Sequence, residues 1–134
     1  MAKLNEIEGI GPAFEAKLNA AGVKTVEGLL KAGATKKGRI GLAEKSGLGE
    51  KNILEWVNAA DLFRIRGVGS EYADLLEEAG VDTVVELATR KPENLFKKIV
   101  EVNTAKKLVR KLPTEAQVTD WVKQAGKLPR VVEY

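Results

Sequence analysis

The chain contains neither cysteine nor histidine. Without cysteine there is no disulfide framework, no thiolate metal site and no cysteine nucleophile. Without histidine, the commonest metal ligand and the usual general base at neutral pH are also missing. No other set of residues in the sequence places a nucleophile beside a base or forms a metal cage. The sequence therefore predicts a protein that is not an enzyme and that uses no metal or cofactor.

Aromatic side chains and long apolar runs are also scarce. Phe, Trp and Tyr make up 5% of the residues, so Ala, Leu, Val and Ile must fill the core. No run approaches the roughly 18 apolar residues of a membrane span, and the start MAKLNEIEGIG lacks the pattern of a signal peptide. The net charge of +3, from 22 basic and 19 acidic residues, permits a polyanion as partner without requiring one. We expect a cytoplasmic protein with no membrane partner.

What the sequence does contain is an internal repeat. Residues 7–30, IEGIGPAFEAKLNAAGVKTVEGLL, match residues 65–88, IRGVGSEYADLLEEAGVDTVVELA, 58 positions later. Trp56 and Trp121 match in a second pair of segments, and their apolar neighbours predict that both are buried. Apolar residues recur at helical spacing in both halves. The sequence predicts an all-α fold with a first unit over 1–61 and a second over 62–134, packed as one compact body.

Proline, threonine and glycine set the expected helix ends. Pro12 suits the first position of a helix that Gly22 ends. Thr25 is expected to cap the next helix, and residues 50–66 to form one continuous helix. Thr104 is expected to cap a helix in the second half. Thr35, Pro92 and Thr114 are expected to open other helices, and the end of the chain to form a short extended tail on the surface.

The glycine pairs resemble a known motif. A hydrophobic-x-Gly-hydrophobic-Gly segment followed by a helix that ends in Ala-Gly-Val resembles the helix-hairpin-helix motif. Two such pairs, in residues 9–11 and 47–49, resemble the paired helix-hairpin-helix domain of DNA repair and replication proteins. Nearly the whole chain, including KLPTEAQVTDWV, resembles an uncharacterised bacterial domain family built from tandem units of this kind. The resemblance implies two tandem paired helix-hairpin-helix units. It also implies that hairpin N–H groups contact DNA phosphates without reading bases.

The candidate nucleic-acid-binding residues lie in the first unit. A helix start exposes unpaired N–H groups and a partial positive charge, and glycine lets a phosphate approach closely. The candidates are Gly9, Ile10, Gly11, Lys17, Lys36, Lys37, Arg39, Gly47, Leu48, Gly49 and Lys51. Lys36, Lys37 and Arg39 are expected to be exposed. A side chain is expected to be poorly tolerated at three hairpin glycines, Gly11, Gly49 and Gly69.

The second half carries conflicting signals. Its basic group comprises Lys97, Lys98, Lys106, Lys107, Arg110 and Lys111, although such a run is often only a solvated helix face. The helix after Gly69 is acidic, which would repel phosphate, and Val102-Asn103-Thr104 replaces the last hairpin's glycines. Two functions remain open. The first, which we favour, is sequence-independent binding to a DNA or RNA backbone through hairpin amides and lysines. The alternative is a protein-interaction or scaffolding module that has lost nucleic-acid binding.

Overall fold

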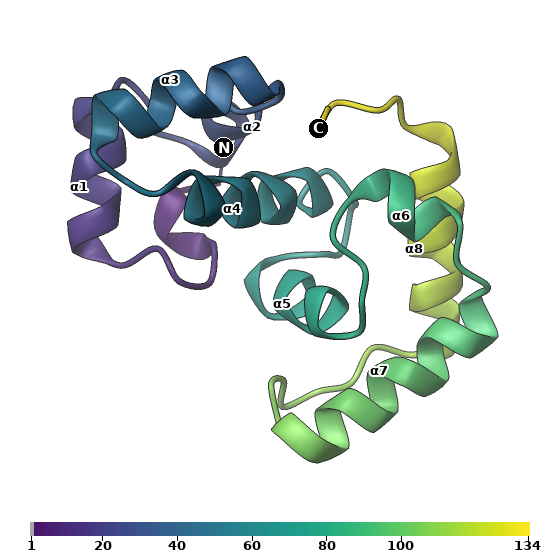
Figure 1. Cartoon of the computed structure of the whole chain (residues 1–134). Coiled ribbons are helices and arrows are strands. Elements are labelled where there is room, and N and C mark those ends of the chain that lie inside the picture. The colour runs from purple at the N-terminus through teal and green to yellow at the C-terminus, as the bar shows by residue number, and fades with distance from the viewer. Residues whose placement is uncertain (1) are drawn as a thin grey trace. The chain divides into compact units, whose positions relative to one another are not determined.

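The computed structural model describes residues 2–134 (Figure 1). These residues form one 3-10 helix, η1 (Leu4–Glu6), and eight α-helices. The helices are α1 (Pro12–Ala20), α2 (Val26–Ala32), α3 (Lys36–Ser46), α4 (Glu50–Leu62), α5 (Ser70–Glu78), α6 (Val84–Ala88), α7 (Pro92–Lys106) and α8 (Glu115–Lys127). Extended pairing within this part of the chain is limited to an isolated antiparallel bridge between Lys3 and Thr25. The predicted all-α fold class is confirmed.

The chain divides into two compact units. The first unit runs to Asp61 and also includes Val131–Tyr134, and the second unit is Leu62–Arg130. We had expected residues 62–134, including the extended tail, to form the second unit. The tail, Val131–Tyr134, belongs to the first unit instead. The backbone N–H of Glu133 donates to the carbonyl oxygen of Ala34 at 2.7 Å, which attaches the tail to the first unit.

Threonine side chains begin four of the helices formed by residues 2–134. Each hydroxyl accepts a hydrogen bond from the N–H three residues further on, at 3.0 to 3.3 Å. The four caps are Thr25, Thr35, Thr83 and Thr114. In contrast, α1 and α5 begin after Gly11 and Gly69, neither of which offers a capping side chain. The predicted starts at Pro12, Thr25, Thr35, Pro92 and Thr114 are confirmed.

The helix predicted over 50–66 ends earlier, at Leu62. The N–H of Ile65 donates to the carbonyl oxygen of Leu62 at 3.0 Å, which closes a tight turn. The next N–H, of Arg66, donates to the side-chain oxygen of Gln124 at 2.8 Å instead of continuing the helix. The Arg66 N–H, which would have extended the helix, therefore bonds a side chain 58 residues away in the sequence.

The helix predicted after Thr104 is absent from the described residues. Thr104 lies in the last turn of α7, where its hydroxyl donates to the carbonyl oxygen of Val100 at 2.8 Å. With no glycine to stop it, α7 continues to Lys106 and ends at Lys107, whose φ of 51° is left-handed. Val109 is held by two hydrogen bonds to the Asn103 side chain, of 2.9 and 3.2 Å. These bonds fix an irregular segment where a helix was expected.

Each unit is built around a buried tryptophan, as predicted. Trp56 is 6% exposed and its ring lies 5.2 Å from the Phe14 ring at 48°. Trp121 is 2% exposed and lies 5.3 Å from the Tyr72 ring at 49°. In the first unit α1 and α2 pack against α3, and in the second α6 and α7 pack against α8. The aromatic pair in each unit holds the start of a glycine-capped helix, α1 or α5, against its core.

Candidate functional site

Three turns contain a glycine pair: residues 9–11, 47–49 and 67–69. The first glycine of each turn has a positive φ, between 74° and 95°, which favours glycine. The second glycines are different, because φ is −89° at Gly11 and −112° at Gly69. Among residues 2–134, a Cβ added at Gly11, Gly49 or Gly69 would meet no heavy atom within 4 Å. The expectation that these three positions tolerate side chains poorly is therefore wrong.

At the centre of each of the first two turns, the side chain points into the core and the backbone is left at the surface. The side chains of Ile10 and Leu48 are buried, at 4% and 8% exposure. Beneath the first turn, a Cβ at Gly9 would lie 3.5 Å from Nε1 of Trp56. The tryptophan that anchors the core therefore also supports the turn, and any ligand at this place would meet main-chain atoms.

The helices after these turns begin with amide N–H groups that precede the first intrahelical hydrogen bond and have no hydrogen-bond partner among residues 2–134. The first intrahelical bond of α1 runs from the N–H of Glu15 to the carbonyl oxygen of Gly11, at 2.9 Å. The N–H groups of Ala13 and Phe14 precede that bond, and Gly11 has no side chain to accept from them. In α4 the equivalent bond runs from Ile53 to Gly49, at 3.1 Å. Both helix starts thus carry the partial positive charge that suits an anion.

Three of the predicted cations surround one hollow of about 330 Å³ in the first unit. Lys36, Arg39 and Lys51 line it together with Glu50, Leu54 and Tyr134. Lys36 and Lys51 are exposed at the starts of α3 and α4. The sequence had suggested Lys36 and Lys51 as one group, and the structure brings them together, but Glu50 adds a negative charge beside them.

The expectation that Arg39 is exposed is wrong. It is 5% exposed, and its guanidinium donates to the carbonyl oxygens of Gly33 at 2.9 Å, Ala34 at 3.2 Å and Glu133 at 2.7 Å. The same group lies 5.9 Å from the centre of the Tyr134 ring. Its fork of donors satisfies carbonyls at the end of α2 and in the tail. Arg39 is therefore a structural residue, and its charge is committed to these contacts.

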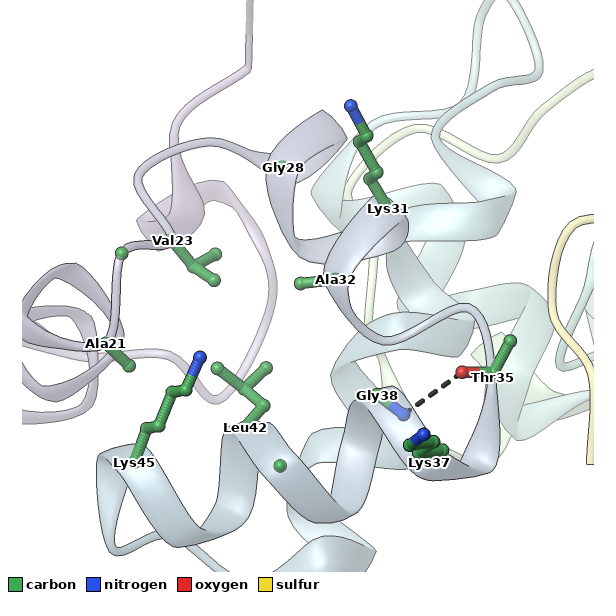
Figure 2. Close-up of a pocket in the computed structure, with 12 residues that line it drawn as sticks. Ala21, Val23, Gly28, Lys31, Ala32, Thr35, Lys37, Gly38, Leu42 and Lys45 are labelled. Carbon is green, nitrogen blue, oxygen red and sulfur yellow. Dashed lines mark hydrogen bonds between the residues drawn. The ribbon is translucent and has the colours of Figure 1, made fainter.

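The other predicted lysines of the first unit lie apart from this hollow. Lys17 is exposed in the last turn of α1, about one and a half turns beyond the helix start. Lys37 lines a different hollow with Lys31 and Lys45 (Figure 2). Lys31 was not among the residues predicted from the sequence, because a single lysine in a short helix is typical of an ordinary solvated face.

The second basic group is partly neutralised. Lys106 pairs with Glu78 of α5, and Lys98 pairs with Glu101 at 3.8 Å. Lys97 is exposed on α7, Lys107 ends that helix, and Arg110 and Lys111 are exposed in the connection to α8. An acidic α5 thus meets part of the basic group within the second unit.

Sequence reasoning missed another set of cations near the third glycine turn. Arg64, Arg66 and Lys127 line a hollow of about 270 Å³ with Gln124 and Leu128. The amide of Gln124 both accepts from the N–H of Arg66, at 2.8 Å, and donates to its carbonyl oxygen, at 3.1 Å. Arg64 and Arg66, three residues and one residue before Gly67, were visible in the sequence, whereas Lys127 joins them only through the fold.

Comparison with known proteins gives a family. Residues 8–128 match the family described as "Domain of unknown function (DUF4332)". The chain belongs to this family. The predicted membership of an uncharacterised domain family is thus confirmed, and no curated protein and no solved structure matches the chain.

Two further properties of this DUF4332 chain concern residues 2–134. No helix in this part has both the length and the apolar character needed to cross a membrane. No group of three or more carboxylates in this part is placed to hold a metal ion.

Proposed function

We propose that the first unit binds the phosphate backbone of DNA without base specificity, through the amides at the starts of α1 and α4. The main support for the proposal is that glycine, rather than a capping residue, directly precedes both helices, at Gly11 and Gly49. No contact with the described residues excludes a side chain at either position, yet four other helices of this part of the chain begin with a threonine cap. Glycine here leaves amide donors uncovered and lets a phosphate approach them.

The arrangement supports backbone binding rather than base readout. Amide and lysine contacts to phosphate position a protein on nucleic acid but carry no sequence information. Lys36 and Lys51, exposed beside the start of α4, supply mobile positive charge, and Lys17 extends it along α1. The acidic side chains of Glu15 and Glu50 oppose it, so we expect weak binding. Two tandem paired helix-hairpin-helix units, related by the repeat, and a cytoplasmic location are part of this proposal.

The test is a titration of a fluorescein-labelled DNA duplex with the full chain, followed by fluorescence anisotropy. We expect dissociation constants in the micromolar range at about 50 mM salt, and a log–log salt slope of roughly −2 to −4, or about −0.9 per neutralised phosphate. Duplexes of unrelated sequence should bind equally. An RNA duplex run in parallel decides whether the backbone contact discriminates between the two nucleic acids.

Two charge-reversal variants of equal charge locate the contact. The first replaces Lys17, Lys36 and Lys51 with Glu, and all three side chains are exposed in the first unit. The second makes the same change at Lys97, Arg110 and Lys111, exposed in the second unit. The first variant should abolish binding and the second should weaken it only modestly, through net charge. Equal losses in both variants would contradict a site in the first unit.

A protein-interaction or scaffolding role is the second candidate. The observation that favours it is the ion pair of Lys106 with Glu78, because a lysine of the second basic group is thereby neutralised within the protein and is less available to phosphate. If micromolar wild-type chain does not raise the anisotropy of the labelled duplex at about 50 mM salt, the nucleic-acid proposal fails and this role replaces it.

A further inference from the structure

A hollow of about 770 Å³ opens within the first unit between the end of α1, α2 and α3 (Figure 2). Its size is that of an ordinary ligand site. Two short helices, α1 and α2, pack against α3 here. A Cβ at Gly38 would lie 2.3 Å from the carbonyl oxygen of Ala32, so the end of α2 lies directly against α3 there. One turn further on, at Gly41, an added Cβ would meet no heavy atom of residues 2–134 within 4 Å.

The centre of the hollow is aliphatic. Ala21, Val23, Ala32 and Leu42 present their side chains around it, as Figure 2 shows. Val23 and Leu42 are also part of the buried core, at 4% exposure each. An apolar group placed here would therefore rest on a surface that the core already supports, and it would gain by leaving water.

The rim is basic. Lys31, Lys37 and Lys45 line the hollow and are exposed, and none of its twelve described lining residues is acidic. In Figure 2 the side chain of Lys45 rises from α3 beside Leu42, with its ammonium group toward the segment that carries Ala21. In the same view the ammonium group of Lys31 points away from the centre. Three exposed lysines lining a hollow with an aliphatic centre complement a ligand with an apolar group flanked by negative charges.

The lining favours a protein segment over a nucleic acid. Proteins hold unpaired bases by stacking them on aromatic rings or guanidinium planes. None of the twelve described residues around this hollow is aromatic or an arginine. Lysine ammonium groups with aliphatic neighbours suit carboxylates beside a branched aliphatic side chain instead.

We propose that this hollow docks an acidic segment of a partner protein, with a leucine, isoleucine or valine side chain in its centre and carboxylates at Lys31, Lys37 and Lys45. The site is separate from the DNA contact proposed above, because it uses neither glycine turn and neither Lys36 nor Lys51. It would allow the first unit to hold a partner protein while its glycine turns contact DNA.

The probe is a fluorescein-labelled peptide of about a dozen residues in which leucines are set among glutamates. We expect the full chain to bind it with a dissociation constant of tens of micromolar. A second peptide with serine in place of each leucine should bind at least fivefold more weakly, because it lacks the apolar group. Equal binding of the two peptides would overturn the proposal.

Two glycine variants test the place of binding. Gly41→Leu adds a side chain to the open space of the hollow, and Gly126→Leu makes the same change in α8, where an added Cβ also meets nothing within 4 Å among the described residues. We expect Gly41→Leu to weaken peptide binding at least tenfold and Gly126→Leu to leave it unchanged. Equal affinity of Gly41→Leu and wild type would overturn the proposal.

A charge variant keeps the test decisive if Gly41→Leu does not fold. Lys31→Glu combined with Lys45→Glu changes two exposed side chains and should weaken peptide binding about tenfold without altering the DNA titration by more than its net charge predicts. Binding of a labelled single-stranded DNA of similar charge is measured in the same way, for comparison with the peptide. If Gly41→Leu abolishes binding of that DNA while the peptide does not bind, the hollow is a nucleic-acid site and the proposal is wrong.

Discussion

The guanidinium group of Arg39 donates a hydrogen bond of 2.7 Å to the carbonyl oxygen of Glu133, a residue 94 positions later in the chain. This bond, with those from Arg39 to Gly33 and Ala34, fastens the tail to the first unit. One buried side chain therefore couples the ends of α2 and of the chain to α3.

Replacing Arg39 with Ala should destabilise the protein by about 2–3 kcal/mol, because hydrogen bonds to charged groups contribute roughly 1.5–3 kcal/mol and their carbonyl partners would be left unpaired. Lys36→Ala, an exposed change in the first turn of the same helix, is the control and should fall within about 0.5 kcal/mol of wild type. Urea denaturation measures both. Equal stability of the two variants would show that the Arg39 contacts contribute nothing.

Gly38 and Gly41 lie one turn apart in α3 and should respond to alanine with opposite sign. A Cβ at Gly38 would lie 2.3 Å from a backbone oxygen, so Gly38→Ala should cost on the order of 1–3 kcal/mol. At Gly41 a Cβ would meet none of the described residues within 4 Å, so Gly41→Ala should stabilise the protein by roughly 0.5–1 kcal/mol through helix propensity. Thermal unfolding of both variants checks the signs, and destabilisation by Gly41→Ala would contradict the open space seen there.

The two glycines of the first turn should also differ. Gly9 has a φ of 94°, where alanine is strained, and Gly9→Ala should cost about 1 kcal/mol or more. Gly11 has a φ of −89°, and a Cβ there would meet none of the described residues within 4 Å, so Gly11→Ala should cost only the difference between the two residues as N-caps, about 0.5 kcal/mol. Chemical denaturation of the two variants in parallel makes the comparison. A larger loss for Gly11→Ala than for Gly9→Ala would reverse the assignment of these two positions.

Features that depend on near neighbours in the sequence could be predicted. Thr25 and Thr35 cap helices because each hydroxyl bonds an N–H three residues away. Gly22, predicted to end a helix, follows α1 with a left-handed φ of 94°. The glycine turns of the candidate site were found in the same way.

Features that depend on distant partners could not be predicted. Arg39 reads as an exposed helix cation until the fold brings the carbonyl of Glu133 to it. The end of α4 depends on Gln124, which takes the N–H of Arg66. The division of the basic residues, with Lys36 at one hollow and Lys37 at another, also follows from packing, because adjacent helical side chains point in different directions.

The most direct test of the central claim is the amide spectrum of the ¹⁵N-labelled full chain during titration with a DNA duplex. The account predicts that the largest chemical-shift changes fall on the backbone N–H groups of residues 9–11, 13–14 and 47–52. Those of the acidic third turn and its helix, residues 67–72, should move little. Changes centred on residues 97–111, or no changes at micromolar protein and low salt, would contradict binding through the two glycine turns of the first unit.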